Sequence, residues 1–290
     1  MGEATAISWT DATFNPWWGC ARVSEACRRC YAESLAKRYG HDVWGKGGDR
    51  RFFGDKHWAD PEKWNRQAEA EGRRRLVFCA SMADVFEDHP ALPPHRERLW
   101  GLIERTPWLT WQLLTKRPEN IAGMVPWSGD WPANVWVGTT VETQRWADER
   151  IPHLLSGAAG ARLRFLSMEP LLGPIDLGLP GIGWVITGGE SGPGATPSHP
   201  DWFRSVRDQC QAAGVPYHHK QWGEWAPVEP DEWPNRRASD SLIRPDGYSW
   251  PLSEPHGTGD ESDSTVTIRR FGKKVAGREL DGRVWDEVPA

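Results

Sequence analysis

Three cysteines, Cys20, Cys27 and Cys30, form a C-x6-C-x2-C pattern near the start of this 290-residue chain. Thiolates this close together in sequence can bind a single metal centre. The same stretch holds no fourth cysteine and no histidine, whereas a structural zinc site normally takes four protein ligands. A cubane iron–sulfur cluster held by three cysteines leaves one iron open to a small molecule. The pattern therefore favours an iron–sulfur cluster with an open iron.

Zinc is the main alternative, with a fourth ligand from a distant position such as His41 or Asp84. A zinc-stabilised module could bind nucleic acid through Trp17, Trp18 and the basic helix after Cys30. A local basic groove is also possible, because five basic residues cluster around the cysteines: Arg22, Arg28, Arg29, Lys37 and Arg38. The net charge of −5 argues against a protein that coats nucleic acid by bulk charge.

The remaining cysteines, Cys79 and Cys210, are isolated in apolar surroundings and are expected in the core. Five cysteines, three of them clustered, argue against a disulfide framework and for a reducing cytoplasm. The sequence has no run of 18 apolar residues and no signal-peptide pattern at its start, so no association with a membrane is expected.

The elements that must position these residues alternate between short apolar runs and helix-prone segments. Strands are predicted at 6–10, 76–80, 109–114, 135–137, 163–166, 184–187 and 216–219, and helices at 61–72, 93–105, 117–124, 143–156 and 200–213. The last helix is expected to have Ser198 or Asp201 as its N-cap and to end at Gly214. This alternation indicates parallel βαβ units, hence an α/β fold of about six to seven strands.

Polar residues follow the predicted strands, at Asp84, Lys116, Glu142, Glu169, Glu190 and Lys220. The carboxyl ends of parallel strands share one edge of the sheet, in a barrel or in a doubly wound sheet. We therefore expect these residues to converge near the cysteine loop. Each carboxylate could instead be a helix cap, and the cations could form salt bridges with the acids.

Three further regions are distinct. Residues 40–60 are expected to form a loop or lid, and residues 226–265 a long surface excursion or partly disordered segment. The tail from Thr265 to Pro289 is expected to contain a short hairpin or strand. We thus expect a domain over 1–225 and a loop-rich extension over 226–290.

Motifs along nearly the whole chain resemble those of the phage and prophage three-cysteine family of radical-SAM-like proteins, whose function is unknown. These motifs are NPWWGC (15–20), CRRCYA (27–32), SMADVF (81–86), LTKRP (114–118), GTTVE (138–142), SMEPLLGP (167–174), GGESG (188–192), KQWGE (220–224), GKKVAG (272–277) and DGR (281–283). The first cysteine gap is wider than in the common C-x3-C-x2-C spacing of radical SAM enzymes, and only the final C-x2-C agrees.

The resemblance implies a partial parallel (β/α) barrel, a [4Fe-4S] cluster on Cys20, Cys27 and Cys30, and S-adenosyl-L-methionine at the open iron. It implies an enzyme that forms a 5′-deoxyadenosyl radical in the host cytoplasm, with an external flavodoxin- or ferredoxin-type electron donor. By analogy the substrate is a modified pyrimidine nucleotide or phage DNA base, such as an amino-acid adduct of hypermodified thymine that is isomerised or rearranged. The expected cofactor-binding residues are Tyr31, Ser81, Asp84, Thr140, Glu142, Glu169, Gly188, Gly189 and Glu190, and the expected substrate-binding residues are Trp18, Lys116, Arg117 and Lys220.

Overall fold

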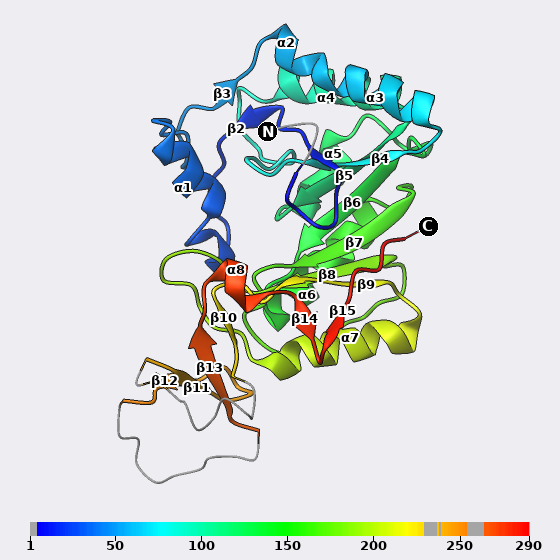
Figure 1. Cartoon of the computed structure of the whole chain (residues 1–290). Coiled ribbons are helices and arrows are strands. Elements are labelled where there is room, and N and C mark those ends of the chain that lie inside the picture. Colours follow the sequence, from blue (N-terminus) through cyan, green and yellow to red (C-terminus); the bar gives the residue numbers. More distant parts are fainter. Residues whose placement is uncertain (1–4, 229–236, 238, 254–263, 290) are drawn as a thin grey trace. The chain divides into compact units, whose positions relative to one another are not determined.

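The computed structural model describes residues 5–228, 237, 239–253 and 264–289 (Figure 1). The chain divides into two compact units. Unit 1 consists of Met1–Thr140, Asp148–Ser167 and Gly181–Gly183, and unit 2 of Val141–Ala147, Met168–Pro180 and Trp184–Ala290. The predicted division near residue 225 stays a prediction.

The main sheet has seven strands in the order β1-β4-β5-β6-β7-β8-β9. These are β1 (Ala12–Thr13), β4 (Arg75–Cys79), β5 (Leu109–Thr115), β6 (Val135–Thr140), β7 (Leu163–Met168), β8 (Trp184–Gly188) and β9 (Tyr217–Gln221). Parallel pairing joins β1 through β7 within unit 1, and β8 to β9 within unit 2. The spatial order follows the chain order, which is the connectivity of a (β/α) barrel, since a doubly wound sheet reverses its order. The predicted α/β class with a partial parallel barrel is confirmed.

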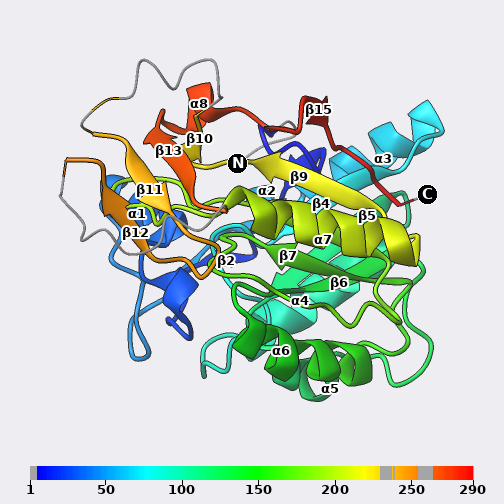
Figure 2. The ribbon, with the colours of Figure 1, turned by 90° about the horizontal axis from the view of Figure 1, so that it is seen from below.

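The predicted helices form close to their expected bounds. They are α3 (Asp60–Glu71), α4 (Pro93–Arg105), the 3-10 turn η2 (Pro118–Asn120) with α5 (Ile121–Met124), α6 (Gln144–Gly157) and α7 (Pro200–Ala213). Figure 1 shows α3 and α4 side by side, and Figure 2 shows α7 running along β9. No helix among the described residues is long and apolar enough to cross a membrane.

The N-cap predicted for α7 is wrong. His199 is the cap, and its Nδ1 accepts a hydrogen bond from the Asp201 amide at 3.1 Å. Pro200 occupies the first helical position, where a missing N–H costs nothing. Gly214 ends the helix in the left-handed conformation at φ +66°, as predicted.

The first strand also differs from the prediction, because β1 spans Ala12–Thr13 instead of 6–10. Side chains take over the hydrogen bonding just before it. The Asp11 carboxylate accepts the Leu76 amide at 2.7 Å, and the Thr10 hydroxyl donates to the Leu76 carbonyl at 3.1 Å. The Leu76 amide thus bonds a side chain in place of the backbone carbonyl that a longer first strand would offer, while the Leu76 carbonyl also accepts the Asp11 amide at 3.1 Å.

Residues 40–60 are mostly loop, as expected, but they include two short elements, β3 (Arg51–Phe52) and α2 (Asp55–Trp58). β3 pairs antiparallel with β2 (Trp17–Trp18). Between them in sequence lie the 3-10 turn η1 (Glu25–Cys27) and α1 (Tyr31–Arg38). Trp18 belongs to a buried cluster with Ala32, Ala36, Val43 and Met82.

The C-terminal part of unit 2 carries a four-stranded sheet that the sequence did not indicate. Its order is β10 (Trp225–Pro227), β13 (Val266–Arg270), β11 (Ser241–Ile243) and β12 (Ser249–Pro251), all antiparallel. A buried Arg269–Asp240 ion pair at 2.9 Å links β13 to the residue before β11. Much of the expected excursion, at 229–236, 238 and 254–263, lies outside the described residues.

The predicted C-terminal hairpin is present. Following the short helix α8 (Lys273–Ala276), β14 (Glu279–Leu280) pairs antiparallel with β15 (Arg283–Val284). Asp281 and Gly282 both adopt positive φ in its two-residue turn, the conformation that tight hairpins require. The Trp285 carbonyl accepts the His219 amide at 2.9 Å, which holds this segment against β9.

Candidate functional site

Cys20 lies in the short segment just after β2, the Cys20 segment, where Gly19 and Cys20 form isolated parallel bridges with Ala83 and Trp44. The Gly19 amide donates to the Met82 carbonyl at 3.0 Å, and the Cys20 carbonyl accepts the Gly45 amide at 3.0 Å. Gly19 has φ +115°, and a Cβ there would overlap the Val43 carbonyl and the Arg50 side chain. Only glycine fits this close approach, so these contacts hold Cys20 in a defined place.

A buried ion pair anchors the residue that follows Cys20. The guanidinium of Arg50 bonds both carboxylate oxygens of Glu87, at 3.0 and 2.9 Å, and these side chains are 0% and 3% exposed. One of the same oxygens accepts the Ala21 amide at 2.7 Å. Arg50 also donates to the carbonyls of Val43 and Gly45. The 40–50 loop and the residues after β4 are thereby fastened to the Cys20 segment.

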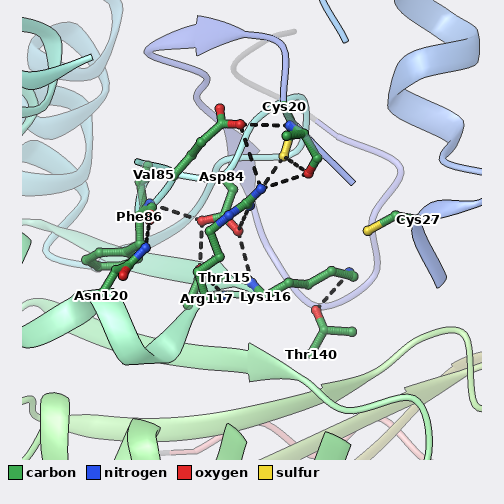
Figure 3. Close-up of polar contacts among 12 residues, drawn as sticks. Cys20, Cys27, Asp84, Val85, Phe86, Thr115, Lys116, Arg117, Asn120 and Thr140 are labelled. Carbon is green, nitrogen blue, oxygen red and sulfur yellow. Dashed lines mark hydrogen bonds and ion pairs between the residues drawn. The ribbon is translucent and has the colours of Figure 1, made fainter. Parts of the chain in front are cut away.

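A second guanidinium, that of Arg117, contacts the Cys20 thiol directly (Figure 3). Its Nη1 lies 3.5 Å from the Cys20 Sγ and 2.9 Å from an Asp84 carboxylate oxygen, and its Nη2 donates to the Ala21 carbonyl at 2.8 Å. Arg117 is 7% exposed. The structure therefore shows Arg117 bonded to the Cys20 segment, and its predicted substrate contact stays a prediction.

Asp84 accepts four hydrogen bonds. Besides Arg117, they come from the Thr115 hydroxyl at 2.7 Å, the Phe86 amide at 3.0 Å and the Lys116 amide at 3.0 Å. Through these bonds Asp84 holds the loop after β4 against the tip of β5. This arrangement gives Asp84 a positioning role, and its predicted contact with a cofactor is untested.

The loop after β4 is held by two further side chains. The buried Arg96 of α4 donates to the carbonyls of Val85 and Glu87, at 2.8 and 2.7 Å. Asn120 donates to the Phe86 carbonyl at 2.9 Å. The loop that carries Asp84 and Glu87 is thus fixed through its own backbone.

The electrostatics of Cys20 follow from this burial. Burial, followed by the negative charges of Asp84 and Glu87, raises the pKa of the Cys20 thiol to about 12, against the opposing effect of Arg117. Burial lowers the pKa of Arg117, but Asp84 and the other acidic groups outweigh it and raise that pKa above its ordinary value. A metal that binds Cys20 must therefore displace the thiol proton.

Cys27 and Cys30 lie on a separate, more open segment. Cys27 ends η1, with its Sγ 3.8 Å from the Ser24 hydroxyl, and Cys30 is the N-cap of α1. Figure 3 shows no contact between Cys27 and Cys20. All five cysteines are free thiols. Burial raises the pKa of Cys30.

The three thiols suit an iron–sulfur cluster by their chemistry, since they are free and two of them are close in sequence. Within the described ranges, however, no three histidine, cysteine, aspartate or glutamate side chains gather closely enough to hold a metal ion. Neither proposed fourth zinc ligand joins them. Asp84 is engaged as described, and His41 packs edge-on against Trp18 with ring centroids 5.7 Å apart. Three cysteine thiols are suitable ligands for an iron–sulfur cluster, but the described residues do not form a closed metal site in this arrangement.

Hydrogen bonds join other predicted site residues of unit 1 in pairs. Lys116 Nζ donates to the Thr140 hydroxyl at 3.1 Å, which links the tips of β5 and β6. The Tyr31 hydroxyl donates to the Ser81 carbonyl at 2.8 Å, so α1 is tied to the loop after β4. Trp18 is only 6% exposed, so its ring is not presented to a ligand in this structure.

The predicted site residues of unit 2 form a group of their own. Glu169, just after β7, accepts Lys220 Nζ on both carboxylate oxygens at 2.8 Å. Gly188 ends β8, the Gly189 amide donates to the Gln221 carbonyl at 3.0 Å, and the Glu190 carboxylate accepts the Thr196 amide at 2.6 Å. Glu142 is fully buried, and its carbonyl accepts the Leu172 amide at 2.8 Å. Convergence of these residues with the cysteine loop stays a prediction.

The prediction from the sequence did not include Arg50 and Glu87 among the site residues. Glu87 follows Asp84 by three positions, in the polar segment after a predicted strand, and that placement was the available signal. Arg50 lies in a loop rich in glycine and arginine, where nothing distinguishes it from its neighbours.

Among solved structures, a mutant of spore photoproduct lyase with bound AdoMet and dinucleoside spore photoproduct matches with a TM-score of 0.43 and 10% identity. The match covers 92% of this chain and 73% of that one. A search of curated proteins found no match. One family profile matches residues 4–289, almost the whole sequence. The chain belongs to the family described as "Protein of unknown function (DUF5131)".

Proposed function

We propose that this protein is a radical S-adenosylmethionine enzyme whose [4Fe-4S] cluster is held by Cys20, Cys27 and Cys30. The observation that carries the proposal is the position of three free thiols after the first strand of a parallel sheet whose order follows the chain. The buried network that fixes Cys20 adds support, since a loop without a ligand to position has little need of two buried arginines.

When bound, the cluster would supply the electron that cleaves S-adenosylmethionine to methionine and a 5′-deoxyadenosyl radical. The protein's own residues would do the rest. Arg117 places a positive charge beside the Cys20 sulfur, which stabilises its thiolate form. Asp84 keeps Arg117 in that position through the bond at 2.9 Å. Lys116 orients the Thr140 hydroxyl at the carboxyl end of β6.

For the substrate we propose a modified pyrimidine nucleotide or a phage DNA base, with an isomerase- or lyase-type outcome. The electron donor would be an external flavodoxin- or ferredoxin-type protein in the host cytoplasm. Lys220 and its partners in unit 2 would contact the substrate, as the cation–carboxylate pair there is only partly buried.

Metal analysis and spectroscopy test the cluster first. Iron, sulfide and zinc are measured after anaerobic reconstitution, with an EPR spectrum of the reduced protein before and after S-adenosylmethionine. About four irons per chain and a spectrum changed by S-adenosylmethionine are expected. One zinc, no iron and an unchanged spectrum would replace radical chemistry with the zinc-stabilised binding module.

Two cysteine variants sharpen this test. Cys27→Ala should abolish cluster formation and the release of 5′-deoxyadenosine. Cys210→Ala removes a buried thiol of α7 in unit 2 and should leave the iron content unchanged. Equal iron in both variants would contradict the assignment of the ligands.

The binding-module alternative has less support. Trp17 and Trp18, its proposed stacking platforms, are 0% and 6% exposed, so neither offers a face on which a base could stack.

A further inference from the structure

The Cys20 sulfur differs from the other two cysteine sulfurs in the group that contacts it. The Arg117 Nη1 lies 3.5 Å from the Cys20 Sγ, so a positively charged donor meets this sulfur (Figure 3). The Cys27 Sγ instead lies 3.8 Å from the neutral hydroxyl of Ser24. Cys30 is the N-cap of α1, and its side chain makes no cap hydrogen bond. Among the described contacts of these three thiols, the one with a cation thus belongs to Cys20.

Bonds on both sides hold the guanidinium of Arg117 in this position. Its Nη1 also donates to an Asp84 carboxylate oxygen at 2.9 Å, and its Nη2 donates to the Ala21 carbonyl at 2.8 Å. The Arg117 amide donates to the Thr115 hydroxyl at 2.9 Å, which fixes the backbone from which the side chain extends. The side chains of Arg117 and Asp84 are 8% and 7% exposed. The donor is therefore preorganised, and little water reaches it to screen its charge.

Two carboxylates near the guanidinium act in the opposite electrostatic sense. Asp84 bonds Arg117 at 2.9 Å, and a Glu87 oxygen lies 3.7 Å from the Arg117 Nη2. Glu87 is in addition paired with Arg50, which offsets its charge. Both carboxylates contact the guanidinium, and the guanidinium is the group that contacts the sulfur. Because Coulomb energy falls with distance, we expect the positive charge of Arg117 to dominate at the Cys20 Sγ.

We propose that Arg117 raises the reduction potential of the cluster by donating a charge-assisted N–H···S bond to the Cys20 sulfur. The proposal rests on the proposed function. Reduction adds one electron, taken from the external donor, so the negative charge on the cluster and its sulfur ligands increases. A cationic N–H donor at a ligand sulfur stabilises this reduced form more than the oxidised form. Arg117 acts through Cys20 and is a positioning residue, which makes the cluster easier for a given donor to reduce.

The reduction potential of the reconstituted, full-length protein tests this proposal. We follow the EPR signal of the reduced cluster during a redox titration of the native chain and of Arg117→Met. Methionine removes both the charge and the donor, so we expect the equilibrium constant for reduction to fall about tenfold. This fall corresponds to a midpoint about 59 mV more negative for a one-electron couple. Arg117→Lys keeps the charge and should shift the midpoint less than Arg117→Met does.

Arg28→Gln is the matched control. It also removes one positive charge next to a cysteine of the pattern, Cys27, but the Arg28 side chain is exposed. Water and dissolved ions screen such a charge, so the equilibrium constant should change by no more than about twofold. Equal shifts in Arg28→Gln and Arg117→Met would overturn the proposal, because the potential would then follow the overall charge and not the bond.

A second measurement uses the native chain alone, because Arg117 also holds the Ala21 carbonyl and its variants could lose the cluster. The protein is prepared with ¹⁵N-labelled arginine, and pulsed EPR of the reduced form detects ¹⁵N nuclei close to the cluster. We expect a ¹⁵N coupling that Arg28→Gln retains. Absence of this coupling in the native protein would overturn the proposal even if no Arg117 variant bound iron.

Failure of this proposal is distinct from failure of the proposed function. A cluster whose spectrum changes with S-adenosylmethionine, but whose midpoint is the same in the native chain and in Arg117→Met, would refute the role of Arg117 alone. A native protein that takes up zinc and no iron would overturn both, since it would hold no cluster whose potential Arg117 could set.

Discussion

Replacing Glu87 with glutamine tests whether the buried pair with Arg50 holds the Cys20 segment in place. The side chain keeps its shape but loses its charge, which leaves the Arg50 guanidinium, 0% exposed, without a counter-ion. Removing one partner of a buried ion pair costs about 3–5 kcal/mol. We therefore expect Glu87→Gln to lower the free energy of unfolding by about 3 kcal/mol or more.

Urea denaturation of the metal-free protein measures this loss, and the iron content after reconstitution shows whether the Cys20 segment keeps its place. Asp55→Asn is the matched control. Asp55 also pairs with an arginine, Arg98 at 2.7 Å, but its side chain is 92% exposed. Loss of this exposed ion pair should lower the free energy of unfolding by at most about 1 kcal/mol and leave the iron content unchanged.

A double variant separates the energy of the pair from its effect on position. Arg50→Met with Glu87→Leu removes both charges, so much of the stability should return. The Ala21 amide would still lack its acceptor, and we expect iron retention to stay low. If Glu87→Gln unfolded no more easily than Asp55→Asn and retained full iron, the pair would not position Cys20.

Gly19→Ala should lower the free energy of unfolding by about 2 kcal/mol or more and reduce iron uptake, because Gly19 has φ +115° and no room for a Cβ. Gly47→Ala should do neither, because a Cβ there would have no atom within 4 Å. Iron analysis and denaturation curves of both variants test this prediction. Burial lowers the pKa of His218 to about 4 and that of His219 to about 3, from an ordinary 6.5. The folded protein thus binds fewer protons than the unfolded chain, so stability is full above pH 6.5 and falls as the pH drops toward 4, by about 2 kcal/mol per histidine at pH 5. The urea midpoint of unfolding, measured at pH 7.5 and 5, should show this loss of stability. His219→Asn should reduce the difference between the two midpoints, whereas replacement of the exposed His153 by glutamine should not. Equal midpoints at the two pH values in the native protein would contradict the reasoning.

The main sheet could be predicted because its strands are apolar runs bounded by turn residues. β5 and β8 formed within a residue or two of their expected bounds, and α4 and α7 matched theirs. The predicted bounds of the first strand were wrong because the side chains of Thr10 and Asp11 hydrogen-bond the backbone of Leu76 in β4. A hydrophobic pattern does not reveal such bonds.

The antiparallel sheet of unit 2 was missed for a different reason. Its strands β10, β11 and β12 have three residues each, too few to display an alternating pattern. Their sequences also contain proline and serine, which more often indicate loops.

The candidate site was predicted in its residue types but not in its connections. Cys20, Asp84 and Arg117 were all identified, because strand ends and cysteine spacing are visible in sequence. Whether Arg117 contacts a ligand or a neighbour depends on hydrogen bonds between residues far apart along the chain. The Arg50–Glu87 pair is of the same kind, since its partners are 37 positions apart.

These long separations bear on the order in which the protein matures. Ala21 is fixed by an acceptor 66 positions later, and the Cys20 sulfur meets a guanidinium 97 positions later. Contacts of such high sequence separation close large loops, so they form late relative to local structure. The cysteines leave the ribosome early, yet Cys20 reaches its final place only after β5 has been synthesised and has joined the sheet. Under the proposed function, insertion of the cluster would therefore follow folding, unlike in a small zinc finger, where binding the metal and folding are one event.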